Sequence, residues 1–404
     1  MLNWVIQFNI FCFLDNNNFE SNGEFDSVLA IAGDNTIELS AANAYKDLKA
    51  FHLKNKGWLF GHLAYDLKNA DPHLSSQHPD KIGFPDGFFF VPRIIIKIKN
   101  SDVSIYAEDP SSVFNAITET SVPVTGAATK YNISNRLSKE EYLASLDRIQ
   151  EHIKRGDCYE INYCQEFFIE NIQTDPLSLY LKLNNTSPNP FAAFYRLNNK
   201  YCMCASPERF LKKTGMQLIS QPIKGTSKRY NDPLKDQQSF ELLSNSEKDR
   251  SENVMIVDLV RNDLSKVCER NSVKATELFK IVPFPQVYQM ISTVTGTFKN
   301  IHWTEALKAT FPMGSMTGAP KHRVMQLIEQ YEHTKRGLYS GTIGYVTPDD
   351  DFDFNVVIRS IFYNSNDQYL SFMAGGGITF KSDPENEYEE CLMKTKAIKD
   401  VLSS

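Results

Sequence analysis

Segments with strand and helix patterns succeed each other irregularly along this chain, and that order constrains its fold more than any other feature. The first hundred or so residues alternate short apolar runs with clusters of Asn, Asp, Gly and Pro, which is typical of strands and turns. Helical spacing appears later, between further strand candidates. A doubly wound fold needs regular strand–helix alternation, so the sequence predicts a large α+β body with antiparallel sheets.

Helix signals are strongest after residue 137. Ser138 and Glu141 have the spacing of a capping box, and the helix that follows is expected to end at Arg155-Gly156. Further helices are predicted from near Ser246, from about 320 to 331, and over 385–402. The residues expected on the buried side of the second helix are Val254, Met255, Leu259 and Val260.

Two apolar runs near the end of the chain, 356–363 and 369–379, are predicted to be strands. The polar turn 364–367 between them favours an antiparallel hairpin. Residues 111–134 form a polar stretch rich in Ser, Thr, Val and Ala, without a strong helical period. We expect this stretch to link an N-terminal lobe, 1–125, to a second region, 138–402.

Charge and apolar patterning exclude several classes of protein. The formal net charge of -6 leaves no overall basic surface, so a nucleic-acid partner is not expected. No apolar run approaches the roughly 18 residues of a membrane span, and Met1–Leu14 is predicted to be a first strand rather than a signal peptide. The 7 scattered cysteines are expected to be core residues in a reducing cytoplasm, with Cys202 and Cys204 on one face of a strand.

Two predicted helices carry carboxylates in pairs. Asp249 and Glu252 are three residues apart, as are Glu387 and Glu390, so each pair shares one helical face. Taken alone, either pair is better explained by a solvated charged face. Both pairs border an apolar stripe, however, and four carboxylates brought together would repel unless a cation such as Mg²⁺ joined them.

Other residues suggest the binding of a small anion. The glycine-rich segments 374–378 and 314–321 would let a backbone approach a ligand closely, although structural turns explain them as well. Arg359 is a charge in an apolar strand and needs a partner, either a substrate carboxylate or a structural salt bridge. Lys224 lies between Pro222-Ile223 and Gly225. A surface lysine in a turn is one interpretation, and a desolvated nucleophile is the other.

Six segments, in this order, resemble those of the chorismate-utilising enzymes, the family of anthranilate synthase component I, aminodeoxychorismate synthase component I and the isochorismate and salicylate synthases. The resemblance covers about 138–402, and its segments are Gly156–Asn162, Ser206–Phe210, Pro222–Thr226, Glu252–Asp263, Gly314–Lys321 and Gly375–Glu390. Residues 57–66 resemble the accessory region of the family more weakly. The resemblance implies packed antiparallel sheets with helices on the outside, an accessory lobe at 1–125 and a chorismate-binding catalytic region at 138–402.

The resemblance also implies a reaction. Members that form aminodeoxychorismate have lysine at the position of Lys224, where the anthranilate, isochorismate and salicylate formers usually have alanine. In the implied mechanism the Lys224 amine attacks C2 of chorismate while Glu208 protonates the departing C4 hydroxyl. Ammonia then attacks C4 and expels the lysine. The expected product is 4-amino-4-deoxychorismate, on the route to p-aminobenzoate and folate.

Mg²⁺ is the implied cofactor, held by Glu252 and Glu390 with Asp249 and Glu387 as close or water-mediated supports. The enolpyruvyl carboxylate is expected on Arg359, Tyr345 and the N–H groups of Gly376 and Gly377, and the ring carboxylate on the loop of Ser315. The further substrate contacts expected are Gly225, Thr226, Thr317 and Lys394.

Gln289 departs from the family pattern, because many members have histidine there. Glutamine can donate a hydrogen bond to the C4 hydroxyl but cannot transfer a proton, so the role of acid falls more heavily on Glu208.

A partner subunit is expected because the chain has no Gly-x-Cys-x-Gly segment of a glutaminase. Ammonia would therefore come from a separate glutamine amidotransferase subunit, in a heterodimer, or from free ammonium. The alternatives are anthranilate synthase component I, an isochorismate or salicylate former that uses water, and a chain without activity that only binds an amidotransferase. Product analysis with chorismate, Mg²⁺ and ammonium separates all four.

Overall fold

Strands and helices follow each other in an irregular order in the computed structural model, which describes residues 1–19, 24–121 and 131–403. The helices are α1 (Leu2–Val5), α2 (Ala44–Lys54), α3 (Pro110–Glu119), α4 (Lys139–Lys154), α5 (Pro176–Thr186), α6 (Pro233–Ser244), α7 (Glu247–Ser265), α8 (Thr304–Thr310), α9 (Lys321–Tyr331) and α10 (Pro384–Leu402), with short 3-10 helices η1 (Tyr65–Ala70), η2 (Pro72–Leu74) and η3 (Gly314–Met316). The strands are β1 (Ile10–Asp15), β2 (Ser27–Leu39), β3 (Leu59–Leu63), β4 (Gly87–Lys99), β5 (Asp102–Tyr106), β6 (Ser134–Asn135), β7 (Glu160–Ile169), β8 (Phe191–Leu197), β9 (Lys200–Ser206), β10 (Arg209–Thr214), β11 (Gln217–Gln221), β12 (Ile223–Lys228), β13 (Lys274–Pro283), β14 (Val287–Thr297), β15 (Gly318–Ala319), β16 (Thr342–Val346), β17 (Phe352–Asn355), β18 (Ser360–Asn364) and β19 (Tyr369–Thr379).

The sheet is antiparallel at every pairing between these strands within the described ranges. One arm of the sheet runs through β1, β8, β9, β18, β19 and β7. The other arm runs through β3, β16, β17, β10, β11 and β14. The long strands β2 and β4 join the arms, because β2 pairs with β1 and β4 pairs with β3.

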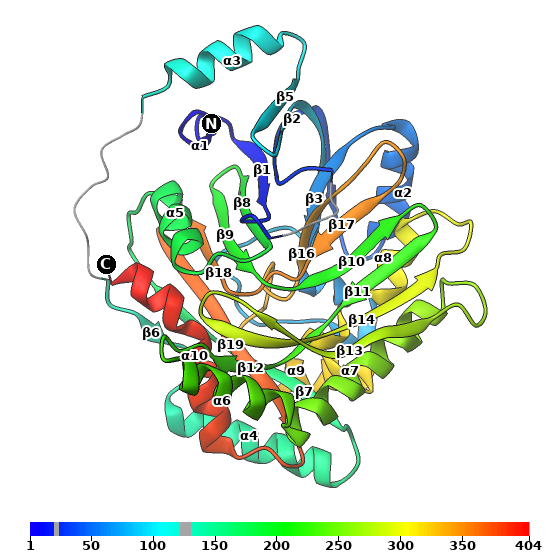
Figure 1. Cartoon of the computed structure of the whole chain (residues 1–404), viewed down its shortest axis with the longest axis vertical. Helices are drawn as coiled ribbons and strands as arrows, with labels where there is room; N and C mark the ends of the chain where they lie inside the picture. The colour runs from blue at the N-terminus through cyan, green and yellow to red at the C-terminus, as the bar shows by residue number, and fades with distance from the viewer. Residues whose placement is uncertain (20–23, 122–130, 404) are drawn as a thin grey trace.

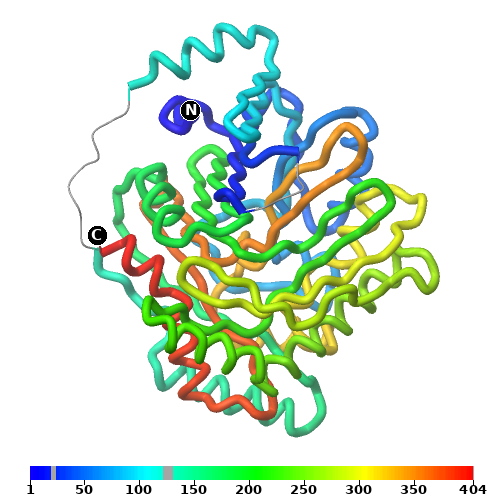
Figure 2. Tube along the Cα trace, viewed as in Figure 1, coloured from blue at the N-terminus to red at the C-terminus, as the bar shows by residue number. Residues whose placement is uncertain are grey.

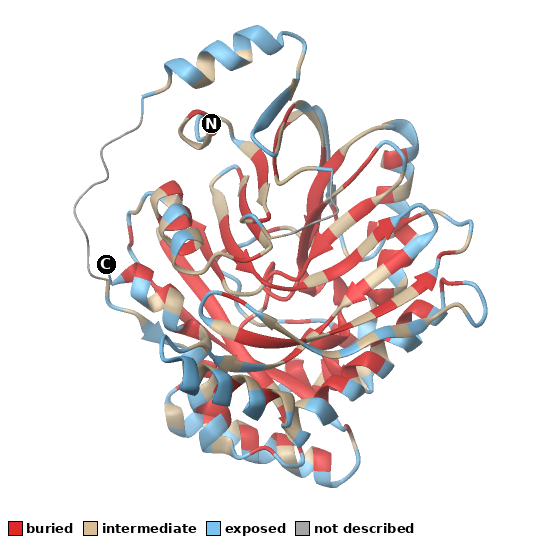
Figure 3. Ribbon diagram, in the orientation of Figure 1, coloured by how far each residue is buried: buried red, intermediate tan, exposed pale blue. Residues whose placement is uncertain are grey.

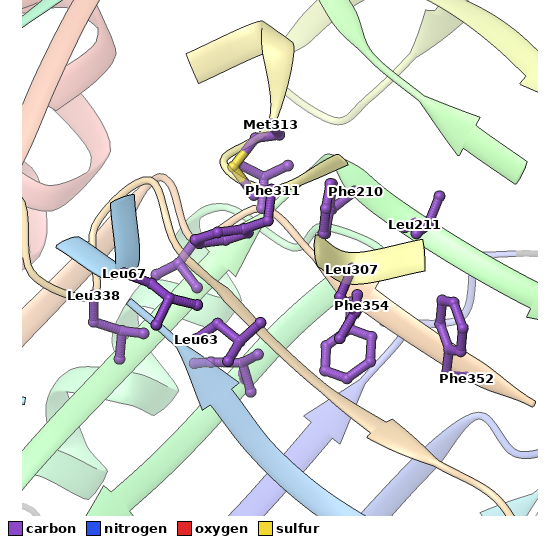
Figure 4. Close-up of a cluster of buried hydrophobic side chains, with 14 of the residues drawn as sticks. Leu63, Leu67, Phe210, Leu211, Leu307, Phe311, Met313, Leu338, Phe352 and Phe354 are labelled. Carbon is purple, nitrogen blue, oxygen red and sulfur yellow. The ribbon is translucent and has the colours of Figure 1, made fainter. Parts of the chain in front are cut away.

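The hydrophobic core has two main parts, one on each side of the first arm. One part lies between the two arms, and Figure 4 shows side chains from it, among them Leu63, Phe210 and Phe354. The other part lies between the first arm and helices α4, α5, α9 and α10. The strands are accordingly mostly buried, whereas the helices expose their outer faces (Figure 3). The predicted α+β fold with helices on the outside is confirmed.

The predicted helices are present, with one error in the facing of α7. Helix α4 begins at Ser138 with a complete capping box, and α7 has Ser246 as its N-cap. Of the four residues predicted to be buried, only Val260 is; Met255 and Leu259 are partly buried, and Val254 is 44% exposed. The buried stripe of α7 instead passes through Asn253, Val257 and Val260, and Val254 lies about 100° around the helix from its neighbour Asn253, on the solvent side.

The beginning of the chain and the predicted link contain helices that the sequence pattern did not reveal. Met1–Leu14 is not one strand, since α1 precedes β1. In the predicted link, α3 follows the N-cap Asp109. None of its residues is fully buried, but Val113, Ala116 and Ile117 pack partly buried against the core at helical spacing, a short apolar stripe that the sequence analysis missed. Residues 122–130 of this link lie outside the described residues.

Strands from the two predicted lobes alternate in the same sheet. β1 pairs with β8 and β3 pairs with β16. Figure 2 shows the same arrangement, with the blue N-terminal trace running into the green and orange trace. The boundary between the lobes near residue 125 stays a prediction. Strands that precede it in the sequence are hydrogen-bonded to strands that follow it, in one sheet.

The C-terminal hairpin of β18 and β19 is confirmed, with Tyr363 opposite Leu370. All seven cysteines are free and buried, as predicted. Cys202 and Cys204 both face the core between the arms, whereas Met203 faces the other part. None of the helices in the described ranges is long and apolar enough to cross a bilayer.

Two neighbouring glycines of β19 should respond differently to alanine. A Cβ at Gly375 would lie 1.9 Å from the backbone oxygen of Tyr163, whereas a Cβ at Gly376 has its nearest contact at 3.4 Å, on a side-chain oxygen of Glu387. Gly375→Ala should therefore lower the Tm by about 5 °C or more, or prevent folding, because β19 and β7 could no longer pair closely. Thermal unfolding of both variants checks this. Equal Tm values for Gly375→Ala and Gly376→Ala would contradict the close pairing.

Candidate functional site

A pocket of about 860 Å³, including its opening to solvent, lies where segments from both arms of the sheet meet helices α7 and α10. Its volume suits a small organic ligand. The predicted site residues that line it are Glu208, Lys224, Gly225, Thr226, Asp249, Glu252, Gln289, Ser315, Arg359, Gly377, Glu390 and Lys394. The fold thus brings together residues that lie up to 186 positions apart in the sequence.

Lys224 lies on β12 with its side chain buried, so it is not a surface lysine. Its Nζ donates a hydrogen bond to Oε1 of Glu160 at 2.5 Å. Burial lowers the pKa of Lys224, but the carboxylates of Glu160 and Glu252 outweigh burial and hold that pKa above its ordinary value. The lysine therefore rests as an ammonium and must lose a proton before it can act as a nucleophile.

Gly377 leaves the space that the Lys224–Glu160 pair occupies. A Cβ at this position would lie 2.7 Å from Oε1 of Glu160 and 2.9 Å from Nζ of Lys224. Gly377 is opposite Asn162 in the pairing of β19 with β7, and Glu160 is two residues earlier on β7. Any other residue at position 377 would push the ion pair apart.

Glu208 comes immediately before β10 and is only 3% exposed. Burial raises its pKa to about 7, against the opposing effects of a hydrogen bond with the Ser315 side chain and the charge of Lys224. A carboxyl with this pKa is protonated in a large fraction of molecules near neutral pH. It can donate a proton and take one back at the same pH, as general acid–base catalysis requires.

The four predicted carboxylates lie on α7 and α10, and lysines contact three of them. Burial raises the pKa of Glu252 to about 7. The Lys394 ammonium, 2.7 Å from Oε1 of Glu390, lowers the pKa of Glu390 to about 2. Lys248 donates a hydrogen bond to Oε1 of the buried Glu387 at 2.8 Å.

The donor set at these carboxylates suits a hard cation. Oε1 of Glu252 is buried and has no hydrogen-bond partner, and the surrounding acidic donors are all oxygens, which Mg²⁺ prefers. Asp249 lies next to Gly225, where an added Cβ would be 3.0 Å from Oδ1. Among the described residues, however, no group of three or more His, Cys, Asp or Glu side chains is arranged to hold a metal ion.

Arg359 lines the pocket but is not in a strand, which corrects the prediction for 356–363. β18 begins only at Ser360, and Arg359 lies in a bend with φ of 54°. Its Nη1 donates a hydrogen bond to the backbone oxygen of Lys394 at 2.9 Å. This unusual backbone conformation places the guanidinium at the pocket. The apolar pattern of 356–358 predicted a continuous strand and did not reveal the bend at Arg359.

Gln289 lies on β14 opposite Thr226 of β12, and both line the pocket. The Gln289 side chain is 4% exposed, and its Oε1 is buried without a hydrogen-bond partner. A buried amide oxygen in this state can accept a hydrogen bond from a ligand.

Tyr345 does not line this pocket, which corrects its predicted role. It is opposite Phe60 in the pairing of β16 with β3, so its ring lies on the same face, and the centroids of Phe25 and Trp58 are 5.1 and 5.7 Å away. It lines a different cavity. Tyr339, which the sequence analysis did not select, lines the pocket instead.

Three other predicted residues lie behind the pocket wall. The Thr317 hydroxyl donates to the backbone oxygen of Met313 and so stabilises the turn that presents Ser315. Gly376 faces Glu387 on α10, and Glu387 itself contacts Lys248. These residues shape the site without lining it.

The sequence analysis also did not select Lys248, which lines the pocket, or Glu160, which pairs with Lys224 beside it. Glu160 belongs to the segment Gly156–Asn162 that carries the resemblance, and Lys248 immediately precedes Asp249. Glu160 on β7 and Lys224 on β12 are 64 positions apart, so no local pattern could have identified their contact.

Comparisons with known proteins show the family of this chain. Residues 11–400 match the family described as chorismate binding enzyme. Aminodeoxychorismate synthase component 1 of Escherichia coli is 38% identical over 87% of this chain and 79% of its own length. Anthranilate synthase component 1 of Saccharolobus solfataricus is 33% identical over 89% of this chain and 85% of its own.

Solved structures share the fold of this chain. The crystal structure of anthranilate synthase component I from Streptococcus pneumoniae superposes with a TM-score of 0.81 at 25% identity, covering 94% of this chain and 93% of that one. The menaquinone-specific isochorismate synthase of Escherichia coli shares the fold, with a TM-score of 0.79 at 17% identity over 100% and 91% of the two chains.

The raised pKa of Glu208 gives a testable pH dependence. The folded protein favours the protonated carboxyl, so from its ordinary pKa of 4.5 up to about 7 the folded state binds more protons than the unfolded state, and stability falls as pH rises. Glu208→Gln removes this effect. The Tm of Glu208→Gln minus that of the wild type should therefore increase from pH 5 to pH 7 and level off above it. A difference that stays constant from pH 5 to pH 8 would contradict the buried carboxyl.

Proposed function

This chain belongs to the chorismate binding enzyme family, and from that premise we propose that it is an aminodeoxychorismate synthase component I, which replaces the C4 hydroxyl of chorismate with an amine from ammonia. The observation that carries the proposal is the buried Lys224, which faces a pocket together with a carboxyl of raised pKa. An amine and a proton donor on one pocket are what a double displacement at a poor leaving group needs.

The first displacement forms a covalent adduct. Glu160, hydrogen-bonded to Nζ, accepts a proton from the Lys224 ammonium. The free amine attacks C2, the ring double bond shifts, and the C4–O bond breaks. Glu208 protonates the departing hydroxyl, which leaves as water. The adduct nitrogen is then a secondary ammonium, and Glu208 is a carboxylate.

The second displacement reverses the proton transfers. Ammonia attacks C4, the double bond shifts back, and the bond from C2 to the lysine nitrogen breaks. The lysine leaves as a neutral amine and takes back its proton from Glu160, while Glu208 accepts the surplus proton from the new C4 ammonium group. In balance, ammonia enters and water leaves, and both carboxyl groups return to their starting states.

Positioning of the ring is assigned to the other pocket residues. The Arg359 guanidinium and the Ser315 loop are the proposed contacts of the two substrate carboxylates, with Gln289 near the C4 hydroxyl. Glu252 and Glu390, supported by Asp249 and Glu387, would hold Mg²⁺, which when bound supplies positive charge for a substrate carboxylate.

The source of ammonia and the biological setting complete the proposal. The relatives are named as a component 1, which supports a second subunit, and we assign to that subunit the release of ammonia from glutamine. The product would feed p-aminobenzoate and folate synthesis. The seven free, buried thiols suit a reducing cytoplasm.

Product analysis tests the function directly. With chorismate, Mg²⁺ and an ammonium salt, the purified chain should form 4-amino-4-deoxychorismate, and glutamine should replace ammonium only when an amidotransferase subunit is added. Anthranilate with pyruvate would identify an anthranilate synthase component I instead, isochorismate or salicylate would identify a water-adding enzyme, and the absence of any product would favour a non-catalytic binding role.

Lys224→Ala tests the covalent route. The variant should lose most 4-amino-4-deoxychorismate formation, by roughly a hundredfold or more, because ammonia would have to displace the hydroxyl without the intermediate. Intact-protein mass spectrometry of the wild type with chorismate and Mg²⁺, without ammonia, should show an adduct that Lys224→Ala lacks. Full synthesis by the variant, with no adduct on the wild type, would reduce Lys224 to an electrostatic role.

A further inference from the structure

Lys248 lies among the acidic residues of the pocket and has no place in the proposed reaction. Its Nζ is 2.8 Å from Oε1 of Glu387 and 3.9 Å from Oε1 of Glu252. These two carboxylates come from different helices, and their side chains are 1% and 9% exposed. The ammonium therefore bridges α7 and α10 at the acidic wall of the pocket.

The Lys248 ammonium compensates the negative charge of buried carboxylates that would otherwise lie close together without a cation. Two facing carboxylates repel each other unless a cation lies nearby, and burial strengthens that repulsion. Lys248 is four residues before Glu252 on α7, so both side chains lie on one helical face. The single positive charge of Lys248 offsets only part of this acidic set, and Oε1 of Glu252 still has no hydrogen-bond partner.

We propose that Lys248 is a positioning residue that occupies the space between Glu252 and Glu387 until a divalent cation displaces it. This inference rests on the metal role assigned under the proposed function. It explains why the described acidic side chains do not converge as a ready-made metal site, since each of Glu252, Glu387 and Glu390 has a lysine ammonium within 4 Å.

The Lys248 side chain is suited to leave. It is 40% exposed, so the flexible stem can move its ammonium to solvent. Lys394 differs, because it is 25% exposed and also donates a hydrogen bond to the backbone oxygen of Gly375 at 2.9 Å. Of these two lysines, Lys248 is the one that can be exchanged for a cation without losing a contact to the sheet.

Displacement of Lys248 would couple metal binding to substrate binding. A dianionic ligand in the pocket adds negative charge and favours the divalent cation over the lysine, and by linkage the cation favours the ligand to the same extent. Without substrate, Lys248 competes with the metal. Removing Lys248 should therefore tighten metal binding mainly in the free enzyme.

The experiment measures binding of Mn²⁺, a paramagnetic substitute for Mg²⁺, to the full chain by electron paramagnetic resonance, with and without chorismate and always without ammonia. Lys248→Met should lower the Kd of the free enzyme for Mn²⁺ by about tenfold or more, and by less when chorismate is present. Lys248→Arg, which retains the charge, should stay within about threefold of the wild type.

Lys266→Met is the matched control for net charge. Lys266 lies at the other end of α7, paired with Asp263, and does not line the pocket. Its loss should leave the Kd for Mn²⁺ unchanged. An unchanged or weaker Kd in Lys248→Met, or equal tightening in Lys266→Met, would overturn the inference. If Lys248→Met does not fold, Lys248→Ala, which leaves no long side chain among the carboxylates, replaces it.

The Glu252→Gln variant distinguishes a failure of the proposed metal site from a failure of the proposed role of Lys248. This variant should bind Mn²⁺ at least tenfold more weakly than the wild type when chorismate is present. If Glu252→Gln binds as well as the wild type, the metal assignment under the proposed function is wrong, whatever Lys248→Met does. If it loses binding while Lys248→Met is unchanged, only the role of Lys248 is wrong.

Discussion

The close pairing of β19 with β7 is the constraint on which the site depends. Three consecutive glycines of β19 each meet a different part of the molecule: Gly375 touches the β7 backbone, Gly376 faces the carboxylates of α10, and Gly377 borders the Lys224–Glu160 pair. A side chain at Gly375 would separate the strands, and one at Gly377 would separate the ion pair, whereas a Cβ at Gly376 would make an ordinary contact. The absence of a Cβ at Gly375 and Gly377 therefore keeps β19, β7 and the lysine close together at the pocket.

Charge compensation is the second organising principle. Three acidic groups in and around the pocket have a lysine beside them, Glu160 with Lys224, Glu387 with Lys248, and Glu390 with Lys394. Pairing makes the burial of so many charges compatible with a stable fold. Glu208 follows a different course, since its charge is avoided by a raised pKa. The same pocket thus holds an ammonium that must be deprotonated and a carboxyl that is protonated in a large fraction of molecules near neutral pH, which is the combination that the proposed displacement uses.

The errors of sequence reasoning have local causes. Tyr339 and Tyr345 are six residues apart in one glycine-rich stretch, and only the pairing of β16 with β3 reveals that Tyr345 packs against Phe60. The strand predicted at 356–363 begins late because Arg359 adopts a positive φ, which an apolar pattern does not reveal. Helix α3 was missed because its apolar stripe is short, with Val113, Ala116 and Ile117 set in a stretch rich in polar residues.

The sequence by itself determined the class of fold, the helices α4, α7, α9 and α10, the C-terminal hairpin and most of the pocket residues, because these depend on caps, periodicity and motifs that are local in the chain. The tertiary structure alone decided which residues contact one another. Glu160 and Lys224 are 64 positions apart, and Lys248 and Glu387 are 139 apart. Such ion pairs depend on strand register and on the approach of two helices, which arise from packing of the whole core and leave no pattern in any single segment.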